Sequence, residues 1–252
     1  MRRYALRDDQ WDRIKDILPG REGHVGATAR DNRLFVDAVI YRYRAGIPWR
    51  DLPERFGAWK AVHTRFSRWG KERCVAQAVR ASRRRRRQRI RHDRQHHRAR
   101  SSAWRRRPKK DGEDQAIGRS KGGLSTKIHT LVDALGNPVG FFPTPGQAHD
   151  LQGADALLPD MKADTLLADK AFDADQRVIE PLQAAGKTCV IPSTSNRKKP
   201  RPYDKEIYKA RHLIENFNCS LKRFRAIATR YDKTATNFLA AIHLAAAIIW
   251  LN

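Results

Sequence analysis

Residues 208–222 read Y-K-A-R-H-L-I-E-N-F-N-C-S-L-K, and the spacing of four of them decides the fold class. The stretch holds no Pro or Gly and follows a Pro-rich loop, so it predicts one helix. At about 100° per residue, four side chains fall within about 60° of one another: Tyr208, Arg211, Glu215 and Lys222. On an arbitrary helix such a face is usually solvated, with an i,i+4 Arg–Glu pair.

The spacing Y-x2-R-x3-E-x6-K resembles the C-terminal signature of the DDE-type insertion-sequence transposases, and all four positions match. The resemblance continues to Lys233 and covers most of the chain. In that family the Glu holds a catalytic divalent metal, while the Tyr, Arg and Lys lie along the DNA. The resemblance therefore implies that Glu215 is a catalytic metal ligand. It also implies three DNA-binding residues: Tyr208, Arg211 and Lys222.

A second carboxylate follows a short apolar run. Residues 165–168 (T-L-L-A) predict a buried strand, and Asp169 sits at its end. Open α/β sheets bind ligands at the carboxyl ends of their strands. The stretch D-K-A-F-D resembles the second-carboxylate motif of the family, which implies that Asp169 is catalytic and binds metal; a capping role stays open. We expect Asp173 and Asp175 to cap a helix that reaches Ala185.

Composition points to a polyanionic partner. The 252 residues carry a formal net charge of +25, and the sequence pI is about 10.8. Nucleic acid is the first candidate for such a charge. The three cysteines have no metal-ligand spacing, which suits a reducing cytosol. The most apolar run, residues 238–251, is too short to span a bilayer, so we expect a buried helix and no membrane partner. We expect the protein in the cytoplasm, associated with the nucleoid.

Residues 1–70 predict a small helical domain of the helix-turn-helix type. A first helix follows Asp8 or Asp9, a second begins near residue 29 and ends at Gly46, and a third spans about residues 58–69. We expect Arg65 and Arg68 on the outer face of the third helix to bind DNA. A helical bundle with an ordinary charged face is the open alternative. The phrase G-I-P-W-R-D-L-P-E-R-F-G-A-W-K, residues 46–60, resembles the N-terminal domain of the same transposases.

Residues 71–108 form a basic segment without an apolar stripe, and five consecutive arginines occupy residues 83–87. Residues 80–110 alone hold sixteen Lys and Arg against one acid, Asp93. One interpretation is a disordered arm that neutralises phosphates. The family comparison suggests another, because related transposases carry here a strand of the form M-I-D-S-T-I-V-R-A-H with the first catalytic Asp. That strand is absent from this frame, and we do not assign its role to Asp93.

A one-base shift restores the family pattern. With codons chosen among synonyms, residues 73–104 can be read as G-V-W-H-R-L-F-A-H-L-A-A-D-A-D-N-E-Y-A-M-I-D-S-T-I-V-R-A-H. The missing Asp would overlap the codons of Arg94 and Gln95. Our hypothesis is a frame shift between roughly residues 73 and 108, caused by gene decay, a sequencing error or programmed ribosomal frameshifting.

Residues 109–252 predict the catalytic domain. Gly136-Asn137 separates two strand-like runs and signals a hairpin, with Asp133 as a structural residue before the turn. Residues 187–191 predict a further strand, and residues 193–203 a DNA-facing loop. The resemblance implies an α/β fold: an RNase H-like mixed sheet with flanking helices, here with its first central strand lost. Two Mg²⁺ or Mn²⁺ ions would be expected in an intact member.

The sequence thus predicts a transposase of a bacterial insertion sequence that cleaves and transfers DNA strands, with this copy inactive. Its partners would be double-stranded DNA, both the terminal repeats of the element and the target, and further copies of itself. Two alternatives stay open. One is a non-catalytic DNA-binding protein or regulator derived from a transposase. The other is a nucleic-acid-binding remnant that does not fold.

Overall fold

The computed structural model describes residues 4–23, 28–72, 90–93, 99–100 and 115–251, and of residues 90–93 and 99–100 only the backbone. The chain divides into two compact units. The first, a helical unit, comprises residues 1–85, 99–115 and 220–252, and the second, a sheet unit, comprises residues 86–98 and 116–219. The predicted boundary at residue 108 falls outside the described residues.

The helical unit contains the three helices that the N-terminal sequence predicts. Its elements are α1 (Asp8–Ile14), α2 (Asn32–Ala45), α3 (Trp59–Lys71), β2 (Ala99–Arg100), α9 (Arg225–Ala228) and α10 (Ala235–Trp250). Short 3₁₀ turns at Lys15–Ile17, Trp49–Asp51 and Glu54–Phe56 lie between the helices. The carboxylate of Asp31 caps α2 by accepting from the backbone N–H of Leu34 at 2.8 Å.

Glycines let the helices of this unit approach closely. Gly46 ends α2 at φ 71°, a left-handed conformation that costs a glycine nothing, and a Cβ there would lie 2.7 Å from Cβ of Arg225. In α3, Gly70 faces α10, where a Cβ would come 3.4 Å from Cβ of Ala240. The expected apolar helix is confirmed as α10, which begins at its N-cap Thr234.

A buried polar cluster joins both ends of the chain inside this unit. Asp232 accepts a hydrogen bond from Tyr43 Oη at 2.8 Å and an ion-paired one from Arg42 Nη1 at 3.2 Å. The guanidinium of Arg42 stacks over Trp49 at 4.7 Å, and burial raises the pKa of the Tyr43 hydroxyl. Arg230 is fully buried and donates to the carbonyl of Gln115. Arg230 and Asp232, which belong to the stretch that resembles the transposase family, therefore stabilise the helical unit.

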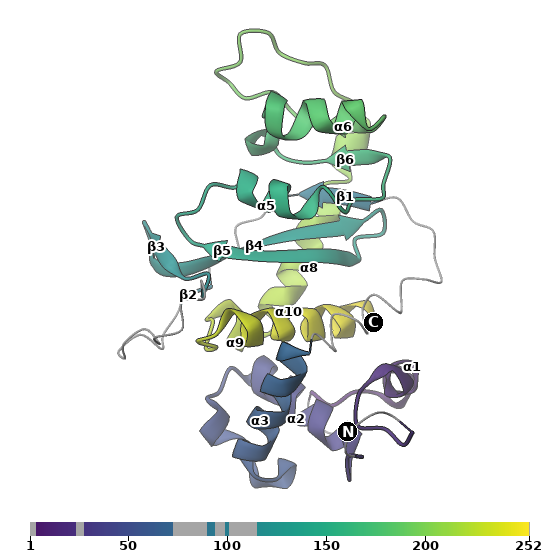
Figure 1. Ribbon diagram of the computed structural model, residues 1–252, viewed down its shortest axis with the longest axis vertical. Coiled ribbons are helices and arrows are strands. Elements are labelled where there is room, and N and C mark those ends of the chain that lie inside the picture. The colour runs from purple at the N-terminus through teal and green to yellow at the C-terminus, as the bar shows by residue number, and fades with distance from the viewer. Residues whose placement is uncertain (1–3, 24–27, 73–89, 94–98, 101–114, 252) are drawn as a thin grey trace. The chain divides into compact units, whose positions relative to one another are not determined.

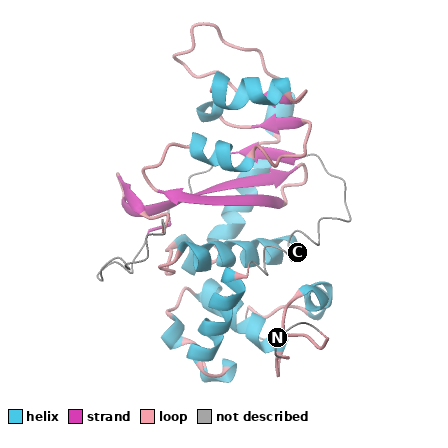
Figure 2. Ribbon diagram, viewed as in Figure 1, coloured by secondary structure: helices cyan, strands magenta, loops and turns pink. Residues whose placement is uncertain are grey.

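The sheet unit holds two groups of strands (Figures 1 and 2). Its elements are β1 (Ile90–Asp93), β3 (Gly118–Ser120), β4 (Gly123–Asp133), β5 (Pro138–Pro145), α5 (Leu151–Leu157), β6 (Thr165–Leu167), α6 (Glu180–Ala184), β7 (Thr188–Val190), α7 (Lys205–Lys209) and α8 (His212–Lys222, whose last three residues count with the first unit). Antiparallel β4 pairs with β1, β3 and β5, whereas β6 and β7 form a parallel pair. Strand β1 also lies beside β6.

The hairpin prediction is confirmed. Asp133 ends β4, and its Oδ1 accepts from the backbone N–H groups of Leu135 and Asn137, both at 2.9 Å. The carboxylate thereby organises the turn, as its expected structural role requires. The strands predicted near residues 165 and 188 are confirmed as β6 and β7. Apolar side chains of α5, β6 and α6, and of the segments that flank them, form a core: Leu151, Ala154, Leu158, Met161, Ala163, Leu166, Ala168, Phe172, Val178, Ile179, Leu182 and Ile191.

The interpretation of the basic segment as a disordered arm is wrong for the backbone of residues 90–93. Their backbone pairs with β4, from Ile90 opposite Asp133 to Asp93 opposite Thr130. A strand ladder is made by backbone N–H and C=O groups, so an Arg- and His-rich stretch can join a sheet edge without an apolar stripe. Most of the remaining basic segment, including Arg94 and Gln95, lies outside the described residues.

Candidate active site

Asp169 lies where a parallel pair of strands ends. In the register of β6 and β7, Leu167 is opposite Val190, and the Ala168 N–H donates to the Val190 carbonyl at 3.3 Å. The next residue along, Asp169, is half-buried, and its Oδ1 accepts from the Ala171 N–H at 2.8 Å. The carboxylate thus caps a 3₁₀ turn, Lys170–Phe172, at the carboxyl edge of the strands, the position at which α/β sheets bind ligands.

Glu215 lies in the first turn of α8. The prediction of one helix over residues 208–222 is wrong, because the chain forms α7 and α8 with Ala210 and Arg211 between them. The N–H of Arg211 bonds to the carbonyl of Tyr208 at 2.9 Å, and that of Ile214 to the carbonyl of Arg211 at 3.2 Å. These i→i+3 bonds tighten the backbone into a turn that interrupts the α-helical ladder.

The four-residue signature is therefore divided between two helices. Arg211 and Glu215 remain an ion pair across the start of α8, with side chains 28% and 37% exposed. Tyr208 belongs to α7, where its ring meets the ring of Tyr203 edge to face, with 5.4 Å between centroids. Lys222 is exposed at the last position of α8 and counts with the helical unit. Arg211 and Tyr208 are still neighbours, since the guanidinium lies 6.0 Å from the phenol centroid.

The two arginines expected on the outer face of α3 have different surroundings. Arg68 is exposed, as predicted. Arg65 instead packs inward: its guanidinium stacks over Phe35 at 4.1 Å and donates to Oδ1 of Asn32. Burial lowers the pKa of Arg65. The expectation that Arg65 lies on the outer face of α3 is wrong, because the apolar stem and planar guanidinium of an arginine can cover aromatic rings. The DNA-binding role of Arg65 stays a prediction.

A group of ion pairs that the sequence pattern did not reveal lies just after Asp169. Asp173 and Asp175 bind Arg197 and Arg201, and the hydrogen bond from Arg201 is the main cause of a lowered pKa for Asp175. The expected capping roles of both aspartates are wrong, since the N-cap of the π-helical turn at Asp175–Ile179 is Ala174, with no side-chain cap. Charge-assisted bonds to guanidinium are stronger than a cap to a neutral N–H. The only advance signal was the count of four cations and no acid in residues 193–203.

The carboxylates have the right chemistry for a hard divalent cation, which prefers oxygen ligands. Their number falls short: within the described ranges, no group of three or more His, Cys, Asp or Glu side chains could hold a metal ion. Glu215 is also engaged by Arg211. Asp169 and Glu215 carry the oxygen donors that such a cation prefers, but the described residues do not complete a metal site.

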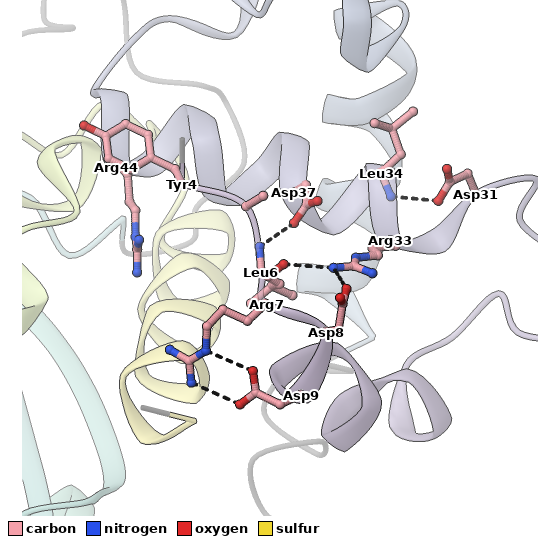
Figure 3. Close-up of a pocket in the computed structure, with 11 residues that line it drawn as sticks. Tyr4, Leu6, Arg7, Asp8, Asp9, Asp31, Arg33, Leu34, Asp37 and Arg44 are labelled. Atoms are coloured by element: carbon pink, nitrogen blue, oxygen red, sulfur yellow. Dashed lines mark hydrogen bonds and ion pairs between the residues drawn. The ribbon is translucent and has the colours of Figure 1, made fainter. Parts of the chain in front are cut away.

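A pocket of about 820 Å³ lies in the helical unit and contains none of the predicted site residues (Figure 3). Its wall is lined by internally paired charges, such as Arg7 with Asp9 and Arg33 with Asp8. Among the described residues, no helix is both long and apolar enough to cross a membrane.

Two family models match the chain. One, described as "Putative transposase of IS4/5 family", matches residues 6–79, and the other, "Transposase DDE domain", matches residues 84–250. A protein of Brucella ovis, "Putative transposase for insertion sequence element IS6501", is 41% identical over 133 residues, which are 51% of this chain and 100% of that protein. An uncharacterised protein of Sinorhizobium fredii, y4sN, is 48% identical over 65 residues, 26% of this chain and 52% of that protein. No solved structure matches.

Proposed function

The chain belongs to the DDE transposases of insertion sequences, and on that premise we propose that its family chemistry is metal-dependent cleavage and transfer of DNA strands at the ends of an element. The position of Asp169 at the carboxyl edge of β6 and β7 is the observation that carries this proposal. The arrangement of antiparallel β1, β4 and β5 with parallel β6 and β7 supports an RNase H-like mixed sheet.

Asp169 and Glu215 are the proposed metal ligands. Divalent cations bound there would supply the Lewis-acid chemistry that phosphodiester cleavage and strand transfer need. Mg²⁺ is the proposed ion and Mn²⁺ the substitute, because both take carboxylate oxygens. The Asp169 carboxylate is held by the Ala171 N–H, and the Glu215 carboxylate by Arg211. Each protein bond fixes the direction of a donor oxygen.

Four cations, one beside Glu215 and three in the helical unit, are the proposed DNA contacts. Arg211 is 28% exposed and rests against Tyr208, so its guanidinium can reach a phosphate as well as Glu215. Lys222 and Arg68 are exposed and free to contact the backbone of the duplex, whereas Arg65 would do so only with its remaining donors. The two consecutive helices α2 and α3 support the proposal that the N-terminal region binds DNA through a helix-turn-helix-like motif.

This copy is proposed to be inactive. Two of three carboxylates cannot fix two metal ions, and the frame in which a first catalytic Asp would be restored overlaps Arg94 and Gln95. Asp93 closes β1, but the sequence around it lacks the family pattern, so we keep the frame-shift hypothesis. The proposed surroundings are the cytoplasm and nucleoid, with homo-oligomers assembled on DNA and no membrane.

One observation favours a second function, a DNA-binding regulator without catalysis: the described residues hold no cluster of three metal-binding side chains. Nicking of DNA that bears the element's ends, with and without Mg²⁺, tests the two functions on the chain as it is and on the chain with its frame restored. The transposase proposal expects Mg²⁺-dependent nicks from the restored chain. Sequence-selective binding with cooperative melting, and no nicking by either chain, would favour the regulator. A chain that neither melts cooperatively nor selects a sequence would be an unfolded remnant.

A further inference from the structure

The loop of residues 193–203 is tied to the turns that follow β6 by two aspartates, Asp173 and Asp175. Arg201 donates from Nη2 to Oδ1 of Asp173 and from Nη1 to Oδ1 of Asp175, both at 2.5 Å. Arg197 bridges the same two carboxylates, at 2.5 Å from Asp175 and 3.2 Å from Asp173. Two guanidinium groups and two carboxylates thus form one neutral cluster.

Asp173 is the centre of this cluster. Its side chain is 1% exposed, and its Oδ2 accepts from the Thr194 N–H at 2.8 Å and from Thr194 Oγ1 at 3.3 Å. A buried carboxylate needs such partners, because removing them would leave an uncompensated charge. Asp173 therefore holds the beginning of the loop through Thr194 and its end through Arg201.

The tip of the loop is left with two uncompensated charges. Lys198 and Lys199 are exposed, and within the described part of the chain neither ammonium has an acidic partner. Pro200 and Pro202 follow them, and each proline restricts its own φ and the residue before it. The Arg201 N–H also donates to Oγ of Ser193 at 2.8 Å, which closes the base of the loop. A stiff loop loses little conformational entropy when it binds.

The loop and Asp169 share one edge of the sheet. Strands β6 and β7 are parallel, so their carboxyl ends lie together. Asp169 follows β6, and the loop follows β7 after Ile191 and Pro192. Asp173, which anchors the loop, is four residues beyond Asp169 along the chain.

From this arrangement we infer that Asp173 and Asp175 are positioning residues that hold Lys198 and Lys199 against the sugar–phosphate backbone of duplex DNA, at the edge where Asp169 lies. The inference rests on the proposed function and names a DNA contact of that site. It also assigns the four cations of the loop to two tasks. The arginines fix the loop, and the lysines bind phosphate.

The lysine contact can be measured with the full chain and a 30-base-pair duplex of arbitrary sequence, because phosphate contacts do not read bases. Replacing Lys198 and Lys199 with Gln should reduce the steepness of the fall of log K with log salt by about 1.8, two contacts at roughly 0.9 each. Lys199→Gln alone should lower it by about 0.9. The control is Lys162→Gln, an exposed lysine at the amino end of β6 and so at the opposite edge, which should leave the slope unchanged.

The positioning role has its own readout. In an Asp173→Asn protein, removing both lysines should change DNA affinity little, because the loop no longer holds them in place. A simple loss of stability would leave the lysine effect intact in the folded protein below its melting temperature. Trypsin should also cut faster after Lys198 in this variant, whereas Lys199 and Arg201 precede prolines and resist cleavage.

The outcomes separate this inference from the proposed function. A chain that binds no duplex DNA overturns both. Strong binding with an unchanged salt slope in the double lysine variant overturns the phosphate contact alone. An equal lysine effect with and without Asp173 overturns the positioning role and leaves the lysines as independent contacts.

Discussion

Two arginine–carboxylate pairs, one in each unit, show what burial decides. Arg42 and Asp232 in the helical unit are 2% and 4% exposed, and Arg211 and Glu215 in the sheet unit are 28% and 37% exposed. The residue types are almost the same. The buried pair is enclosed by aromatic rings and stabilises the fold, whereas the half-exposed pair is open to water, and we propose that it exchanges its partner for a metal ion or a phosphate. On the proposed function, burial separates the motif residues that stabilise the fold from those that contact metal or DNA.

The largest expected effect is on catalysis at the half-exposed pair. In a frame-restored protein, Glu215→Gln should lower the rate of Mg²⁺-dependent cleavage by several orders of magnitude, because it removes a member of a metal-binding unit. DNA affinity, measured by anisotropy, should stay nearly the same. The matched control is Glu206→Gln, an exposed glutamate paired with Lys209 on α7, which should cut at the parent rate. Unchanged cleavage by the Glu215 variant would refute the site.

The next effect is on stability at the buried pair. Asp232→Ala should lower the free energy of unfolding by about 3–5 kcal/mol, because Arg42 would keep a buried charge without its partner. Urea denaturation measures the loss. Asp12→Ala serves as the control, since it breaks an exposed pair with Lys15 and should cost at most about 1 kcal/mol. A similar loss in both variants would mean that burial does not decide how much an ion pair of this protein contributes to stability.

The smallest effect is on stability at the half-exposed pair. Arg211→Gln should reduce the free energy of unfolding by only about 0.3–0.5 kcal/mol, as expected for an i,i+4 pair that water screens. DNA affinity should fall by more than this loss of stability explains if Arg211 binds a phosphate. A destabilisation as large as that of Asp232→Ala would make Arg211 a structural residue and remove it from the proposed interface.

Sequence patterns predicted the elements whose signals are local and strong. The apolar residues of α10, the Gly136-Asn137 turn and the apolar run before Asp169 all gave elements at the expected places. The third predicted helix is confirmed as α3, whose inner face consists of Val62, Phe66 and Trp69 at helical spacing, all buried.

Other features depended on partners far along the chain. The break between α7 and α8 falls at Ala210 and Arg211, and no Gly or Pro marks this position in the sequence. Pairing of β1 with β4 is made by backbone groups, which the side-chain pattern of an Arg-rich stretch does not report. The bonds from Arg197 and Arg201 to Asp173 join residues more than twenty positions apart. Charge counts and helical periodicity report local patterns only, so they do not predict the helix break, the pairing of β1 with β4 or these ion pairs.

The central claim is that the catalytic set consists of Asp169, Glu215 and a third carboxylate that this reading frame does not encode. The most direct measurement is a paired assay of the chain as it is and of the chain restored by one base near codon 73 and compensated near codon 108. Each of the two chains is incubated with Mg²⁺ and with DNA that carries the sequences flanking its gene, where the ends of the element lie. We predict strand cleavage by the restored chain alone. Cleavage by the original chain that Asp93→Asn abolishes would contradict the claim and give the third role to β1.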